Sequence, residues 1–143
     1  MYKFLLAILI GLLVVPSAFA RDDVGDYSIK DALILERAKA ALGTDIQFYF
    51  GAQSHGEPDK VFGEFGTNKK TNAFGKSDIE ACQWVFLSAM VALRDRAVRE
   101  GGNAVVNIRS NYKNNTTSST ETFQCGAGNV MAGVALIGTV VEL

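Results

Sequence analysis

The sequence predicts an α+β domain in which an antiparallel β-sheet packs on one long helix, with an extra N-terminal helix. Two observations lead to this fold class. Residues 78–100 carry apolar side chains at helical spacing, and several shorter segments alternate apolar and polar residues as strands do. These segments follow the order helix, two strands, long helix and further strands, which is typical of an α+β domain rather than of repeated βαβ units.

Composition limits the class of protein. The chain has 143 residues, 48% of them hydrophobic, which is enough apolar material for a packed core and excludes disorder as the main state. The formal net charge is −1, whereas nucleic-acid-binding proteins normally carry a basic excess. We therefore expect one globular domain, residues 21–143, with no nucleic-acid partner.

The first 20 residues have the organisation of a secretory signal peptide. Lys3 precedes an apolar run over residues 4–15, Pro16 interrupts it, and Ala18 and Ala20 form an A-x-A cleavage site. The run is shorter than the ~20 residues of a transmembrane helix, although an uncleaved anchor is the alternative. We expect a mature chain that begins at Arg21, is periplasmic or secreted, and has no membrane anchor after cleavage.

The N-terminal half begins with an acidic stretch, residues 21–26, that we expect to be flexible. Ser28 can cap a helix over residues 28–42, whose apolar stripe includes Ile34, and Gly43 ends it. Strands are predicted over residues 46–50 and 61–65, separated by a polar loop over residues 53–59.

The long helix, residues 78–100, has the clearest boundaries. Ser77 and Glu80 form a capping box before it, and Gly101-Gly102 stops it. One face carries a stripe that should meet the sheet: Ile79, Cys82, Phe86, Met90, Leu93 and Ala97. A second apolar face, formed by Trp84, Leu87 and Val91, is a candidate interface. Either the N-terminal helix covers that face, or another copy or a partner does, so a homo-oligomer is one expectation.

The C-terminal segments read as strands. Residues 104–108 should place Val106 and Ile108 inward, and residues 111–120 form a solvated hairpin loop. A return strand covers residues 121–125, and the Gly-Ala-Gly sequence at 126–128 allows a bulge or a turn. Residues 130–143 are apolar on both faces, which predicts a central or interface strand.

The two cysteines, Cys82 and Cys125, are expected to form a structural disulfide, because cysteine pairs in exported proteins are usually oxidised. The alternatives are a redox-active pair or a soft metal site. The sequence has no C-x-x-C, and the lone His55 cannot complete a zinc set. We expect no catalytic residue, no metal ligand and no cofactor.

A lysine-rich segment precedes the long helix. Gly75-Lys76-Ser77 matches the end of a nucleotide-binding P-loop, but Lys70 stands where the first glycine should be, which opposes a phosphate-wrapping turn. The same predicted loop could instead bind an anion or an acidic partner, or simply be solvated. Its candidate residues are Lys69, Lys70, Asn72, Lys76 and Ser77.

The C-terminal half resembles known proteins. The segments that carry the resemblance are residues 97–108 (AVREGGNAVVNI), Tyr112 and residues 133–141 (GVALIGTVV). Over about residues 61–143 the chain resembles the YbjQ-like family of small proteins described as heavy-metal-binding and, more distantly, the stress-sensing lipoprotein RcsF. Including residues 48–51 and 67–78, it is similar to exported proteins labelled excinuclease ATPase subunit.

The resemblance implies a sheet packed on one long helix and, for YbjQ-like proteins, ring-shaped oligomers. It also implies that Cys82 and Cys125 correspond to one RcsF disulfide. The chain lacks the second cysteine pair, the lipid anchor and the proline-rich linker of RcsF.

We therefore expect a non-catalytic exported binding or envelope-sensing module, stabilised by one disulfide, whose partner is an envelope protein or a small ligand. The alternatives are an oligomeric metal- or small-ligand-binding protein and, less favoured, a nucleotide-dependent enzyme that uses the lysine-rich segment.

Overall fold

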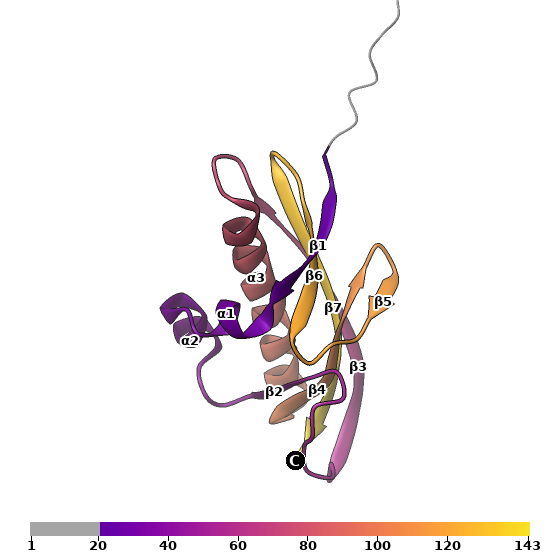
Figure 1. Ribbon diagram of the computed structural model, residues 1–143. Helices are drawn as coiled ribbons and strands as arrows, with labels where there is room; N and C mark the ends of the chain where they lie inside the picture. The colour runs from indigo at the N-terminus through magenta and orange to yellow at the C-terminus, as the bar shows by residue number, and fades with distance from the viewer. Residues whose placement is uncertain (1–20) are drawn as a thin grey trace, which may run out of the picture.

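A computed structural model describes residues 21–143, and the predicted signal peptide, residues 1–20, lies outside the described residues. The fold is α+β, as the sequence predicts: a curled, mostly antiparallel sheet packs against one long helix (Figure 1). Its strands are β1 (Asp23–Ser28), β2 (Gln47–Phe50), β3 (Lys60–Asn72), β4 (Ala104–Tyr112), β5 (Asn115–Thr117), β6 (Thr122–Ala127) and β7 (Met131–Glu142). Its helices are α1 (Ile29–Leu33), α2 (Glu36–Leu42) and α3 (Asp78–Glu100).

Strand β7 is the centre of the sheet. Along one edge it pairs with β3 over the whole length of β3, from Lys60↔Glu142 to Asn72↔Met131. Two strands share its other edge: β4 pairs with its C-terminal part and β6 with Ala132 and Gly133. Burial on both faces is the reason that the segment is apolar throughout, and the prediction of a central strand is confirmed.

The outer strands extend this centre. β1 pairs antiparallel with β6, β5 pairs antiparallel with β4, and β2 pairs parallel with β4. The expected antiparallel sheet therefore contains one parallel pair. The predicted loop over residues 111–120 is partly wrong, because Lys113 and Asn114, both with positive φ, form a two-residue turn between β4 and β5.

The N-terminal segment differs from the prediction in two ways. Residues 23–28 form a strand rather than a flexible acidic stretch, because pairing with β6 satisfies their backbone polar groups. The single predicted helix, 28–42, is divided into α1 and α2, since Leu35 has extended backbone (φ −64°, ψ 138°). The break leaves Ile34 exposed, whereas the residues that α1 and α2 bury are Ile29, Ala32, Ala38 and Leu42.

Helix α3 has the predicted bounds. The Ser77 Oγ accepts a hydrogen bond from the Glu80 backbone N–H at 3.1 Å, and Gly101 ends the helix in the left-handed conformation (φ 87°). The predicted inward stripe is buried except at its first residue, Ile79, which is 61% exposed. Ile79 lies in the first turn of α3, where it lines a small pocket with Tyr27 of β1.

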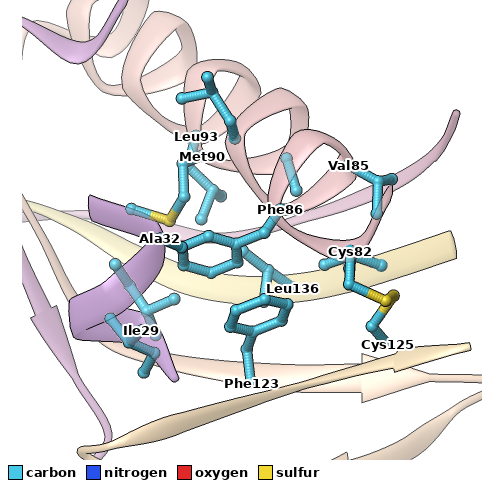
Figure 2. Close-up of a cluster of buried hydrophobic side chains, with 14 of the residues drawn as sticks. Ile29, Ala32, Cys82, Val85, Phe86, Met90, Leu93, Phe123, Cys125 and Leu136 are labelled. Atoms are coloured by element: carbon cyan, nitrogen blue, oxygen red, sulfur yellow. A yellow bond between two sulfur atoms is a disulfide. The ribbon is translucent and has the colours of Figure 1, made fainter. Parts of the chain in front are cut away.

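The core lies between α3 and the sheet (Figure 2). The Phe86 ring, from α3, stacks on the Phe123 ring, from β6, with centroids 4.0 Å apart. Below α3, β7 contributes Gly138, where a Cβ would lie 2.5 Å from the Val105 Cγ1 atom. The side chains of Val105, Ile108 and Leu93 therefore fill the space that a side chain at position 138 would occupy.

Strand β4 contains a bulge that overturns one expectation. Asn107 has φ 49°, and the register with β7 shifts between Val106 and Arg109. The extra residue places Ile108 on the same face as Val105, in the main core. Val106 instead packs in a smaller cluster with Ala104 and Val141. Val106 and Ile108 are both buried, but they do not share a face as predicted.

No helix within residues 21–143 combines the length and the apolar character needed to cross a bilayer.

Candidate functional site

The lysine-rich segment is not one loop. Lys69, Lys70 and Asn72 lie on β3, opposite Val134, Gly133 and Met131 of β7, so their predicted position in a loop is wrong. The turn is confined to residues 73–77. Because residues 70–72 are held in the sheet, residues 70–77 do not form the continuous loop that wraps a phosphate in a P-loop.

The remaining candidate residues of this segment bond locally. The Asn72 side chain accepts a hydrogen bond from the Phe74 N–H at 2.8 Å, and the Lys76 ammonium donates to the Asn72 carbonyl at 2.7 Å. Ser77 caps α3. These groups shape the turn, and Lys69 and Lys70 are the two candidates that project from β3 into solvent.

A groove of about 450 Å³ lies between β3 and α3. Three cationic side chains line it, Lys69 from β3 and Arg96 and Arg99 from α3, together with the Phe65 ring and one acidic residue, Glu64. The Arg96 guanidinium lies 3.9 Å from the centre of the Phe65 ring and bonds to Glu100 at 2.8 Å. We call Lys69, Arg96 and Arg99 the basic margin. These three side chains outnumber the acidic lining residue of the groove, Glu64, whose carboxylate is paired with Arg109.

A second groove, of about 390 Å³, lies on the opposite face of the sheet. Small residues of β3 and β7, including Gly66 and Ala135, lie beside polar groups from the β4–β5 hairpin. Its polar lining residues are Glu64, Thr67, Asn68, Asn111, Lys113 and Asn114. β3 therefore has a groove with three cationic side chains on its helix side and an amide-rich groove on its open side. Four residues of β3 line both grooves: Glu64, Gly66, Thr67 and Asn68.

A polar cluster occupies the open face near the start of β1. The Tyr112 hydroxyl donates to the Asp22 carboxylate at 2.8 Å, and the Lys113 ammonium bonds to the other oxygen of that carboxylate. Hydrogen bonds from Lys113 and Tyr112 lower the pKa of Asp22, and the charge of Lys70 acts in the same direction. Burial, followed by the bond to Asp22, raises the pKa of Tyr112 to about 12. Gly126 leaves room for this arrangement, since a Cβ there would lie 2.0 Å from the Tyr112 hydroxyl.

Arg21, the predicted first residue of the mature chain, is also held. Its guanidinium bonds to both carboxylate oxygens of Asp78, at 2.6 and 3.2 Å. Asp78 is in the first turn of α3, where a negative charge is favourable. The start of the described chain is thereby fixed to α3 on one side and to the hairpin on the other.

The disulfide is present. Cys82 of α3 and Cys125 of β6 are bonded, with their Cα atoms 5.9 Å apart and both residues fully buried (Figure 2). The bridge ties the helix to the sheet, and its sulfur atoms face the core as the stripe on α3 predicts. An oxidised pair is the expected state of these cysteines in an extracytoplasmic compartment.

The second face of α3 is largely covered within the chain. Leu87 is 8% exposed and belongs to the same buried cluster as Ala38 and Leu42 of α2, and Val91 packs partly buried against that cluster. Trp84 remains 39% exposed, with the Arg37 guanidinium 4.2 Å from its ring centre. Of the two expectations for this face, coverage by the N-terminal helices accounts for Leu87 and Val91.

Sequence reasoning identified Lys69 and Lys70 but missed the residues that surround them. Arg96 and Arg99 are three positions apart on α3, so helical spacing places them on one side, but which element lies beside them depends on the tertiary fold. Thr67 and Asn68 are polar residues in a segment that resembles a loop, and Lys113 carries no local pattern at all. Within residues 21–143 no group of three or more His, Cys, Asp or Glu residues is arranged to hold a metal ion.

Comparison of the chain with protein-family models, with curated proteins and with solved structures found no match in any of the three.

Proposed function

We propose that the protein is a non-catalytic binding module of the periplasm or the extracellular space that recognises an acidic partner protein through the basic margin. The observation that carries the proposal is the position of Lys69, Arg96 and Arg99 in one groove beside β3. Ammonium and guanidinium groups are positively charged hydrogen-bond donors. They are therefore suited to bind carboxylates.

The disulfide supports the location. It closes 43 residues of chain and is buried between α3 and β6, so it belongs to the folded framework rather than to a reactive surface. A domain that depends on such a bond is suited to an oxidising compartment. An envelope-sensing role is the particular form of this function that the resemblance to RcsF favours.

The charges on the basic margin set the expected strength of binding. Lys69 and Arg99 are exposed, and Arg96 is half-buried and paired with Glu100. Exposed ion pairs contribute about 0.2–1 kcal/mol each. Several together therefore give weak, salt-sensitive binding rather than a permanent complex.

The proposal is tested by titrating ¹⁵N-labelled protein with a nine-residue peptide of alternating threonine and glutamate while recording amide chemical shifts. We expect shifts that saturate, that concentrate on β3 and the last turns of α3, and that weaken as salt is added. A peptide with lysine in place of glutamate should cause none. The absence of saturable shifts with the acidic peptide, or shifts spread over the whole surface, would contradict the proposal.

A charge-reversal pair sharpens the test. Lys69→Glu with Arg99→Glu should abolish saturable binding. The matched control is Lys30→Glu with Lys39→Glu, which makes the same charge change at exposed positions on α1 and α2. The control should bind as the parent does, because those lysines lie away from β3.

A further inference from the structure

The outer edge of β3 is the longest unpaired strand edge of the described chain. β3 has 13 residues and pairs with β7 along one edge, and no strand of residues 21–143 pairs with the other (Figure 1). An unpaired edge presents a row of backbone N–H and C=O groups to solvent, and such a row is a template for another strand.

A bulge sets the limits of this template. The register of β3 with β7 shifts between Val61 and Gly63, and it is then regular from Gly63 to Asn72. Regular pairing on the inner edge implies regularly spaced backbone groups on the outer edge. The usable edge is therefore residues 63–72, and it includes every β3 residue that lines the two grooves.

The two sides of this edge differ in chemistry. The helix side carries the basic margin, and the open side carries Asn68, Asn111 and Lys113, the last of which is paired with Asp22. The one carboxylate of this edge, Glu64, is paired with Arg109. Successive side chains of a strand point to opposite faces of a sheet. A strand added here would direct every second side chain toward the basic margin and the others toward the amide-rich groove.

Resting on the proposed function, we infer that the acidic partner binds as an extended segment that adds to residues 63–72 of β3 as a further strand of the sheet. Its acidic side chains occupy alternate positions and face Lys69, Arg96 and Arg99, and its intervening side chains are small and polar. Backbone hydrogen bonds provide part of the affinity, and the alternation of acidic residues provides the specificity.

Backbone methylation tests strand addition separately from charge. Two variants of the threonine–glutamate peptide are made, one methylated at every threonine amide and the other at every glutamate amide, with no change of side chain. In a strand, these two sets of N–H groups point to opposite edges, so only one set can bond to β3. Affinities are measured by fluorescence anisotropy.

We expect methylation of one set to weaken binding about tenfold or more and methylation of the other to change it by less than about twofold. In the complex with the unmethylated peptide, alternate amides of residues 63–72 should gain protection from hydrogen exchange. Lys69→Glu should weaken binding about fivefold, whereas Lys30→Glu on α1 should not.

The remaining outcomes separate the inference from the function on which it rests. Equal effects of the two methylated sets, or no effect of either, would overturn strand addition while leaving charge-driven binding in place. Failure of the unmethylated peptide to bind would overturn both. The lysines of β3 would then serve only to protect a sheet edge from aggregation.

Discussion

Replacing Cys82 and Cys125 together by alanine is expected to lower the free energy of unfolding by about 4 kcal/mol. The bridge joins residues 43 positions apart, and a loop of that size costs the unfolded chain about 4 kcal/mol of conformational freedom at 25 °C. Both sulfur atoms lie in the core, so the alanine pair also leaves a small cavity, which adds to the loss.

The magnitude is large compared with the stability of a domain of this size, which is typically about 5–15 kcal/mol. The double variant should therefore remain folded only marginally at room temperature. Urea unfolding followed by circular dichroism gives both the free energy and its dependence on urea. That dependence should become steeper, because the unfolded chain without the bridge is more expanded.

Val85→Ala is the matched control, since Val85 is also fully buried on α3 and its truncation leaves the bridge intact. It should cost about 2 kcal/mol with an unchanged urea dependence. A loss below about 1 kcal/mol for the double variant would refute the loop-entropy argument. Two free thiols in the denatured, unreduced protein would refute the bridge itself.

Three other predictions concern the core, the polar cluster and the second face of α3. Gly138→Ala should cost about 1–3 kcal/mol in urea unfolding, because its Cβ would lie 2.5 Å from a valine methyl group. In Asp22→Asn, the pKa of Tyr112 should fall below about 12, measured by ultraviolet absorbance, but stay above 10, because burial, the larger cause of the shift, remains when the carboxylate is gone. Leu87→Ala should cost about 2–5 kcal/mol, whereas Trp84→Ala should cost about 1 kcal/mol, because only Leu87 is buried.

The pKa shifts also set the sign of two pH effects. The pKa of Tyr112 is higher in the folded chain, so its contribution to stability is complete below pH 10 and is lost as pH rises from about 10 to 12. The pKa of Asp22 is lower in the folded chain, so its contribution is complete above the ordinary value of 3.8 and is lost as pH falls below it. Stability that does not change across either window would contradict the geometry of this cluster.

A second glycine provides the control for Gly138→Ala. Gly56→Ala, at a position where a Cβ meets nothing within 4 Å, should leave stability unchanged.

Light scattering of the parent and of Trp84→Ala tests whether the second face of α3 mediates self-association. A parent that self-associates and a variant that is folded and monomeric would show that Trp84 belongs to an interface between copies. A monomeric parent would show that the Trp84 face does not mediate self-association.

The features that the sequence determined are those set by neighbours along the chain. Helix α3 begins at the cap provided by Ser77 and ends at Gly101, because the groups that satisfy its ends lie within one turn. Helical spacing places Cys82 on the same face of α3 as Phe86 and Met90, so its direction toward the sheet was also predictable. An apolar segment such as residues 131–142 must lie inside a sheet wherever its partners are, so its central position was also predictable.

Features that depend on distant partners were decided by the tertiary structure. Residues 68–72 are polar and resemble a loop, yet they form a strand because β7 satisfies their backbone groups along one edge. Residues 23–28 form β1 because β6 offers an edge about a hundred positions along the chain. The bulge at Asn107 decides which face Ile108 occupies. The candidate site arises in the same way, since Lys69 meets Arg96 and Arg99 only after α3 packs on β3.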